Sequence, residues 1–474
     1  MKKTFLLLTI VAVLAMPMAA MAAAEFSLGG FIKLDAFWDS TQEGKNMNTV
    51  IARNNLVNGQ HGRLHFTSQG SRFNFTIKGP KLWGATTTGF LEMDFDSQEE
   101  GLSAATGARG IAAIGASNSY TPRLRHAMFR LNWPETELLF GQYWSMFSQW
   151  YPELLQDGPF QITGTPTARL PQIRFTQKFA GSWQVAALIG DPNGITNGQS
   201  YNANIDRTGG ESAETPQVQG QVQFAQDLYG KAAWYGVPTP FTAQVTAGWQ
   251  RAFIAEQNAQ AFRATGLDTF NAIANGAARH KAVDPWVVMG SLFIPVIPTH
   301  SANLAGTASI QTSWWIGQGV EAFGWIGFGS QVYRFVGAGN VGGAVSNVFD
   351  VDLMARFGGQ IEGQYYFNNQ WFVTGAWGMS RAFGVGAFQS GGLGIGNYTR
   401  QNWFAAASDP VNYHNEFDLA LWYRPIKAFK FGLQYAYNRT NYFQNLRSGT
   451  AATPSNVTNL GEAHRVEFVG LFFF

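Results

Sequence analysis

The sequence predicts an all-β protein: a transmembrane antiparallel β-barrel of about 16 strands (16–18) that forms one domain over residues 25–474. Apolar and polar residues alternate with a period of two along most of the chain, as they do in a strand with lipid on one face and water on the other. Aromatic residues make up 15% and charged residues 13%, whereas about a quarter of a soluble domain is charged. Beyond the first 24 residues, no apolar run reaches the ~18 residues that a transmembrane helix needs.

Residues 1–24 are expected to be a signal peptide. Lys2 and Lys3 precede an apolar run over 5–14, and small residues follow at 22–24, which is the three-part layout of an export signal. Without these two lysines, 30 basic residues balance 30 acidic ones, so no nucleic-acid partner is expected. The absence of cysteine excludes disulfides, Cys-based zinc sites and covalently attached haem.

The first strand is expected to begin at residue 25 and to present one face to lipid and the other to the lumen. The residues at even-numbered positions are apolar, with Phe26, Leu28, Ile32, Leu34 and Trp38. Those of the other parity, at odd-numbered positions, are polar, with Ser27, Lys33, Asp35 and Asp39. Phe31 and Phe37 depart from this pattern. A charged side chain in the middle of the lipid face costs about 2–4 kcal/mol, so the polar parity is assigned to the lumen.

Within the second strand, the polar residues shift from odd-numbered to even-numbered positions. Arg63, His65 and Thr67 are in phase, whereas Arg72, Asn74 and Thr76 have the opposite parity. A one-residue β-bulge around Gly70 would return both sets to the lumen. The alternative is a tight turn at the same place.

Alternation continues through the remaining strands, over 72–78, 91–96, 217–224, 241–250, 416–424 and 430–439. Short turns are expected at 79–81, 133–136, 367–370 and 424–427, and long external loops near 40–61, 97–119, 145–168, 191–215, 254–284, 384–414 and 441–461. The Ala-rich part of 251–280 could form a short helix, and the Gly-rich stretch 285–350 does not divide clearly into strands.

The last strand, over 464–474, places Val466, Phe468, Phe472 and Phe474 on one parity. Outer-membrane barrels resemble this pattern, because their assembly machinery reads a C-terminal strand that ends in an aromatic residue. Phe474 is therefore the expected assembly signal, and the barrel assembly machinery, outer-membrane lipid and lipopolysaccharide are the expected partners.

Five stretches resemble the DcaP-like trimeric porins of diderm bacteria. They are Ser71-Arg72-Phe73-Asn74-Phe75, Glu92-Met93-Asp94-Phe95, Arg123-Leu124-Arg125-His126-Ala127, Gly141-Gln142-Tyr143-Trp144-Ser145-Met146-Phe147 and Leu170-Pro171-Gln172-Ile173-Arg174-Phe175. The resemblance implies sixteen strands, a homotrimer, a third loop folded into the pore, and basic residues that favour small anionic solutes such as dicarboxylates. The chain departs from some members of that family in having no N-terminal helical coiled-coil extension before the first strand.

Parity and charge indicate which residues line the pore and set its selectivity. The basic candidates are Lys33, Arg63, Arg72, Lys78, Arg123, Arg125 and Arg174, and the acidic ones are Asp35, Glu92 and Asp94. Arginine suits this role because it stays protonated and its planar guanidinium can pair transiently with a carboxylate. The alternative is that these charges pair with one another and brace the wall.

The stretch 145–168 is the candidate constriction loop, with Trp150, Tyr151, Glu153 and Asp157. It could set Glu153 or Asp157 against the arginine-bearing wall. The alternative is an ordinary external loop.

Together these features predict an outer-membrane porin for passive diffusion of small hydrophilic, anionic solutes, without enzymatic activity, cofactor or metal. The alternative is a barrel that sheathes a cytochrome in an electron conduit, with the haem carried by a partner. An enzyme is disfavoured because the seven histidines suggest no pairing of a nucleophile with a base on neighbouring strands.

Overall fold

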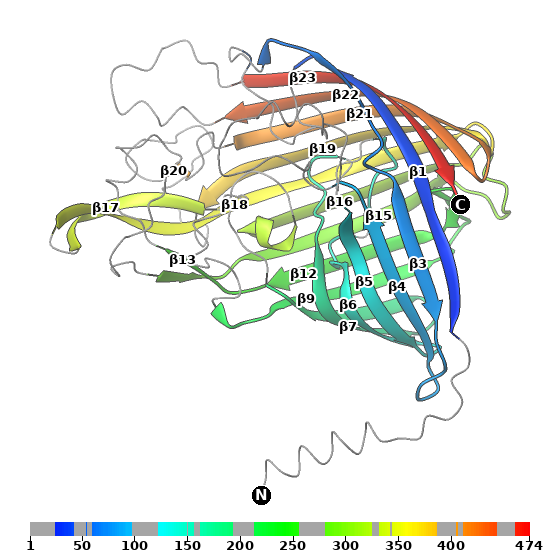
Figure 1. Cartoon of the computed structure of the whole chain (residues 1–474), viewed down its shortest axis with the longest axis horizontal. Coiled ribbons are helices and arrows are strands. Elements are labelled where there is room, and N and C mark those ends of the chain that lie inside the picture. The colour runs from blue at the N-terminus through cyan, green and yellow to red at the C-terminus, as the bar shows by residue number, and fades with distance from the viewer. Residues whose placement is uncertain are drawn as a thin grey trace, which may run out of the picture.

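The fold was obtained as a computed structural model. It describes residues 24–41, 54, 59–96, 122–148, 150–155, 162–192, 213–255, 280–324, 331–341, 344–385, 404–405, 411–442 and 460–474. All of the predicted leader except residue 24, most of the helix expected within 251–280, and Asp157 lie outside these residues. The described part forms a closed antiparallel barrel of sixteen strands (Figure 1), which confirms the predicted fold class.

Sixteen wall strands arise from seventeen of the labelled elements, because β2 and β3 together form one strand. The wall strands are β1 (Glu25–Asp39), β2 (Arg63–Thr67), β3 (Arg72–Lys78), β4 (Thr86–Asp94), β5 (Arg123–Asn132), β6 (Thr136–Trp144), β7 (Arg169–Phe179), β8 (Trp183–Gly190), β9 (Gln217–Gln226), β12 (Phe241–Trp249), β15 (Trp286–Ile297), β16 (Ala308–Gln318), β18 (Ala344–Tyr366), β19 (Trp371–Val385), β21 (Val411–Ile426), β22 (Phe429–Tyr442) and β23 (Leu460–Phe473).

The other elements belong to connections between wall strands. β10 (Ala232–Trp234) and β11 (Val237–Thr239) form a hairpin between β9 and β12, and β13 (Ala252–Ala255) pairs with β14 (His280–Val283). The 3₁₀-helix η4 (Val320–Phe323) follows β16, β17 (Gln331–Val341) pairs with the first part of β18, and β20 (Phe404–Ala405) pairs with β17. Among the described residues, no helix is long and apolar enough to span a bilayer.

The barrel closes where its first and last strands pair. β1 pairs with β23 from Phe31↔Phe473 to Asp39↔Arg465, and with β3 on its other side. The C-terminus lies beside β1 at the right of Figure 1, at the end of the barrel that carries the short turns. Closure leaves no free edge in the wall, which is the condition for strands to cross lipid.

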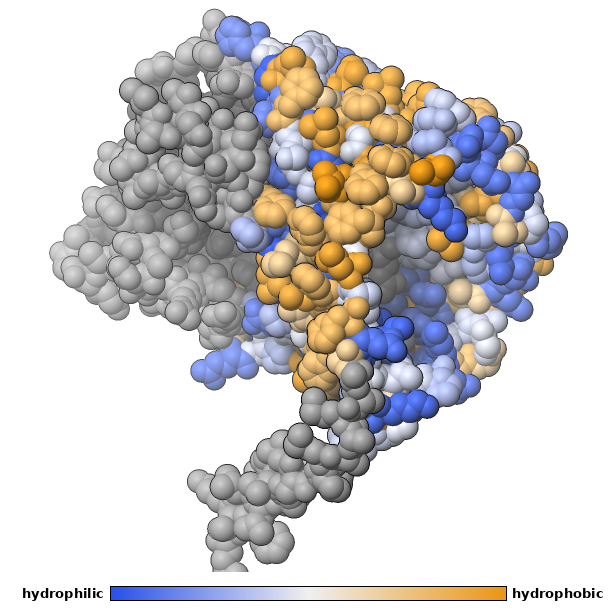
Figure 2. All heavy atoms as spheres, turned by 45° about the vertical axis from the view of Figure 1, so that its right-hand side comes forward, coloured by the Kyte–Doolittle hydropathy of each residue, from blue (hydrophilic) through white to orange (hydrophobic). Residues whose placement is uncertain are grey.

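Exposure alternates along the strands as the sequence predicts. In β1, Ile32 and Leu34 are 52% and 47% exposed, whereas Lys33 and Asp35 are 5% and 1% exposed. Figure 2 shows exposed apolar side chains gathered in a band over the wall, with more polar residues toward the short-turn end. The outer face is therefore a membrane-facing belt, and the polar parity faces inward.

The register break around Gly70 is a β-bulge that contains a tight turn. β1 pairs with β3 up to Phe31↔Arg72 and with β2 from Asp35↔Thr67, so three residues of β1 (32–34) lie opposite four residues (68–71). The Ser71 amide donates to the Ser68 carbonyl at 3.0 Å. The extra residue compensates for the change of parity, so the two structures considered for this position occur together.

Candidate functional site

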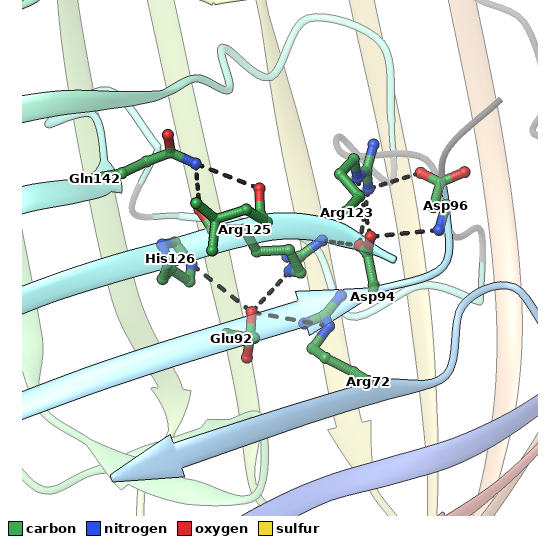
Figure 3. A network of polar contacts seen from close by, with 9 residues as sticks. Arg72, Glu92, Asp94, Asp96, Arg123, Arg125, His126 and Gln142 are labelled. Carbon is green, nitrogen blue, oxygen red and sulfur yellow. Dashed lines mark hydrogen bonds and ion pairs between the residues drawn. The ribbon is translucent and has the colours of Figure 1, made fainter. Parts of the chain in front are cut away.

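A second bulge, in β5, turns two consecutive polar side chains, Arg125 and His126, toward the lumen. Glu92 lies opposite His126 and Met93 lies opposite Leu124, so Arg125 is the extra residue. Leu124 is 47% exposed on the outer face, whereas Arg125 and His126 are buried. Strict alternation would have separated Arg125 and His126 onto opposite faces, and the bulge instead brings both to the network drawn in Figure 3.

Five residues at the centre of this network form a chain of ion pairs that joins β5 to the end of β4 and to Asp96 just beyond it. Arg123 contacts Asp94 at 2.7 Å and Asp96 at 2.9 Å, and Arg125 contacts Glu92 at 2.7 Å and Asp94 at 2.6 Å. Arg72 of β3 lies 3.9 Å from Glu92. These predicted residues therefore lie together on the inner wall, where they also brace one another.

A second level of charge lies nearer the short-turn end of the same wall. Arg130 and Arg174 lie 3.2 Å and 3.5 Å from Glu137. Both guanidinium groups lie over the ring of Tyr143, at 5.6 Å and 5.4 Å from its centroid. Arg174 was predicted to face inward, whereas Arg130 and Glu137 were not among the predicted residues. For Arg130 the reason is the β5 bulge, which reverses the parity before residue 130 is reached.

Arg169, at the start of β7, is a further functional candidate that sequence reasoning missed. Its parity differs from that of the inward-facing Arg174, but its guanidinium stacks on Trp144 at 5.1 Å, and Arg125 lies over the same ring at 5.6 Å. No carboxylate among the described residues pairs with Arg169, and its Nη1 is buried without a hydrogen bond. The signal in the sequence was its place beside Leu170, directly after the predicted constriction loop.

We define the arginine wall as the inner face of β3–β7 with its six arginines and four acids. The arginines are Arg72, Arg123, Arg125, Arg130, Arg169 and Arg174, and the acids are Glu92, Asp94, Asp96 and Glu137. Six guanidinium groups against four carboxylates leave a formal excess of two positive charges on this wall.

The remaining predicted wall residues lie elsewhere on β1–β3. Lys33 pairs with Asp35 at 2.8 Å and donates to the Leu155 carbonyl at 3.1 Å. Arg63 pairs with Asp39 at 2.9 Å. Lys78 pairs with Glu25 at the end of β3, where its side chain is 69% exposed, and its role in the pore stays a prediction.

The stretch 145–168 folds into the barrel. Met146, Phe147, Leu154 and Leu155 are at most 3% exposed, although they belong to a connection and not to a strand. Tyr151 lies near the arginine wall, with its ring 5.7 Å from that of Trp144. The segment is therefore an internal loop in its described part, and the ordinary external loop is ruled out for those residues.

Glu153 does not face the arginine wall. Its carboxylate pairs with Lys430 of β22 and lies 3.9 Å from Arg424 of β21, and its amide donates to Glu362 of β18 at 2.7 Å. The hypothesis that Glu153 opposes the arginines is wrong, because the loop crosses the lumen and reaches the strands on the other side of the β1–β23 seam.

The returning part of the loop contacts β16, β19 and β21. The Thr163 amide donates to Glu416 at 2.7 Å, and the Trp315 indole donates to the Gly164 carbonyl at 2.7 Å. A Cβ on Gly378 would lie 1.9 Å from the Thr163 carbonyl oxygen. Glycine at this position therefore allows the loop backbone to approach the wall.

The inner face of β9–β16 is mostly uncharged. Gln217, Gln219 and Gln221 of β9 are at most 4% exposed, and hydrogen bonds link them to Gln250, to one another and to Thr246. The lumen is therefore asymmetric, with a charged wall on β3–β7 and an amide-rich wall across from it. In the part of the chain that the structure describes, no three His, Asp or Glu side chains are arranged to hold a metal ion.

No family model and no curated protein matches this sequence. The fold is similar to the crystal structure of the outer membrane channel DcaP of Acinetobacter baumannii, with a TM-score of 0.60 and 15% identity over 96% of this chain and 98% of that chain. The anion-selective porin from Comamonas acidovorans gives a TM-score of 0.48 at 10% identity, covering 95% of this chain and 100% of that chain. OprB of Pseudomonas putida gives 0.47 at 10% identity, covering 95% and 94%.

The first of these comparisons establishes a shared fold, that of a sixteen-stranded outer-membrane channel. The likeness extends over nearly all of both chains, so it concerns the whole barrel. A closed barrel of this fold with an apolar belt places the chain in the bacterial outer membrane.

Proposed function

We propose that this chain is a porin that lets small hydrophilic, anionic solutes diffuse passively through its lumen, small dicarboxylates among them. The observation that carries the proposal is the formal positive excess of the arginine wall, together with Arg169, which has no carboxylate partner among the described residues. Fixed charges that project into a narrow aqueous path select ions by their sign.

Arg169 provides the physical basis for anion preference. A guanidinium already paired with a carboxylate attracts a passing anion weakly, because the paired charges nearly cancel. Arg169 instead lies on an aromatic ring beside Arg125, with an N–H group that makes no hydrogen bond to the described residues. Arg169 as a whole is only partly buried, so a carboxylate in the lumen could approach its positive charge and then leave, which is what conduction requires.

The internal loop disfavours the alternative of a sheath around a cytochrome. A barrel that encloses a folded haem protein needs an empty interior, whereas the described part of 145–168 crosses the lumen from Trp144 to Lys430. We propose further that the chain assembles as a homotrimer, by analogy with the family that it resembles. Chemical cross-linking of the protein in membranes would test this, since a ladder that ends at the dimer would contradict it.

Single-channel recording in planar bilayers under a salt gradient tests the main proposal. The wild type should conduct without an added partner, and its reversal potential should show anion preference. Arg169→Gln should shift the reversal potential toward cation preference, while Lys78→Gln, which changes a charge exposed at the short-turn end, should leave it near the wild-type value. Absence of conductance, or cation preference in the wild type, would overturn the proposal.

A further inference from the structure

The hairpin of β10 and β11 enters the barrel from the short-turn end. β9 and β12 are neighbours in the wall, and a two-residue turn would suffice to join them, but 227–240 lies between them. At its tip, Tyr235 and Gly236 have φ of 49° and 73°, the left-handed conformation of a tight hairpin turn. Ala232 and Ala233 are 0% and 1% exposed, so the hairpin is packed inside the barrel.

Hydrogen bonds fix this hairpin to the wall strands beside it. Lys231 and Thr299 exchange two backbone hydrogen bonds, at 2.9 Å and 2.7 Å. The Ser309 hydroxyl of β16 donates to the Ala233 carbonyl at 2.9 Å. The hairpin is therefore held at Thr299, in the connection after β15, and at Ser309 of β16, and its tip has a defined position in the lumen.

The tip contacts the constriction loop. The Tyr235 hydroxyl donates to the Pro152 carbonyl at 2.9 Å. The rings of Trp234 and Trp150 lie 4.7 Å apart, and Trp150 stacks in turn on Phe293 of β15 at 5.8 Å. Two consecutive residues of the hairpin thus hold residues on both sides of Tyr151.

Arg424 links the same two elements a second time. A Cβ on Gly236 would lie 2.5 Å from the Arg424 Nη1, so the guanidinium rests directly on the turn. The same group lies 3.9 Å from the Glu153 carboxylate. The hairpin tip, Arg424 and Glu153 therefore form one contact region where two inward-folded segments from opposite ends of the barrel meet.

We propose that the β10–β11 hairpin is a positioning element for permeation: it supports the constriction loop from the short-turn end and so sets the open cross-section. This inference rests on the proposed porin function. The Glu362 and Gln434 side chains accept from the Glu153 and Leu155 amides, which holds the loop against the wall. The hairpin supplies support along the barrel axis that those bonds do not.

The test compares Tyr235→Phe and Trp234→Ala with Tyr229→Phe. The first variant removes one hydroxyl, and the second removes the ring that stacks on Trp150. Tyr229 lies in the same connection and is 43% exposed, so it is a matched control. Single-channel conductance and open-channel current noise are recorded, and the heat-dependent shift in gel mobility shows whether each barrel has folded.

We expect Trp234→Ala to raise the conductance roughly 1.5- to 2-fold, because conductance scales with the open cross-section, and Tyr235→Phe to raise the current noise. Tyr229→Phe should match the wild type. If folded Tyr235→Phe and Trp234→Ala both match the wild type, the hairpin does not position the loop and the inference fails. If the wild type itself does not conduct, the porin function fails instead, so the two failures are distinguishable.

Discussion

At the residue scale, the pairing of Asp39 with Arg465 joins the first and last strands of the barrel. Asp39 accepts from Arg465 at 2.6 Å and 3.0 Å and from Arg63 at 2.9 Å. Arg465 also lies 4.1 Å above the ring of Phe37, which explains why this aromatic residue departs from the outward apolar set. Asp39 and Arg465 are thus both buried and paired with each other.

Asp39→Asn should lower the free energy of unfolding by about 3 kcal/mol, because removing one partner leaves the guanidinium of Arg465 buried without its main counter-charge. Equilibrium unfolding in urea, followed by tryptophan fluorescence in lipid vesicles, measures the change. Asp227→Asn is the control, since its pair with Lys231 at 3.8 Å is exposed and should contribute less than about 1 kcal/mol. Equal losses in the two variants would show that the seam has no special role.

Alternation identified inward residues wherever the strand is regular. It placed Lys33, Asp35, Arg72 and Glu92 on the inner face, where the structure has them, while their role in selectivity stays a prediction. It missed Arg130 because a bulge has no fixed sequence signature, and one extra residue reverses every later assignment. It missed Arg169 because a strand's first residue takes its direction from the preceding loop as much as from the sheet.

At the scale of elements, glycine on the inner wall decides whether the constriction loop can dock. Gly378 of β19 faces the loop, and a Cβ there would lie 1.9 Å from the Thr163 carbonyl oxygen and 3.0 Å from Ile162 Cγ1. Gly375 of the same strand has space, since its nearest neighbour would be Leu419 Cδ1 at 3.8 Å. A comparison of substitutions at these two positions therefore separates the effect of the loop contact from the general effect of replacing a glycine in a strand.

Gly378→Ala should displace the loop while the barrel still forms. Overpacking of this kind costs about 1–3 kcal/mol, and the displaced loop should raise the conductance and the current noise. Gly375→Ala should leave both recordings unchanged. The expectation fails if folded Gly378→Ala gives wild-type recordings, because the loop contact would then not influence the open pore.

Of the two elements that fold into the lumen in the described part of the chain, one was predicted from the sequence and the other was not. The loop after the Gly-Gln-Tyr-Trp-Ser motif was expected to turn inward by family resemblance, and its described residues do so. The β10–β11 hairpin was not expected, because Tyr235-Gly236 reads as an ordinary turn and a hairpin has the same pattern inside a barrel as outside it. Its position depends on contacts with Pro152 and Ser309 that are distant in sequence.

At the scale of the whole molecule, the fold was predictable because the same constraint applies to every wall strand. Lipid on one side and water on the other impose period two, and a closed sheet imposes paired edges. The sequence left the strand count open between 16 and 18, because 285–350 holds β15, β16, η4, β17 and only the beginning of β18, a strand of 23 residues. The first part of β18 pairs with β17 and the rest pairs with β16, so one strand belongs to both a connection and the wall.

Lysine substitutions at two consecutive residues of β7, one facing lipid and the other facing the lumen, test which face of this strand is which. Phe175 is 42% exposed and Thr176 is 9% exposed, and both lie near the middle of Arg169–Phe179. Phe175→Lys should lower the free energy of unfolding by about 2–4 kcal/mol, the cost of a cation on the lipid face near midplane. Thr176→Lys would place the same cation beside Glu137, its neighbour in the β6–β7 register, and should change the stability by less than about 1 kcal/mol.

The difference in unfolding free energy between Phe175→Lys and Thr176→Lys should depend on whether the barrel lies in a lipid bilayer or in a detergent micelle. Such a dependence is specific for a membrane barrel. Unfolding in urea from lipid vesicles, followed by tryptophan fluorescence, gives both values. In detergent micelles the penalty for Phe175→Lys should shrink, because a lysine can reach water through a thinner and more deformable apolar layer. A larger loss for Thr176→Lys than for Phe175→Lys would reverse the two faces of β7 and, with them, the inward assignment of Arg174.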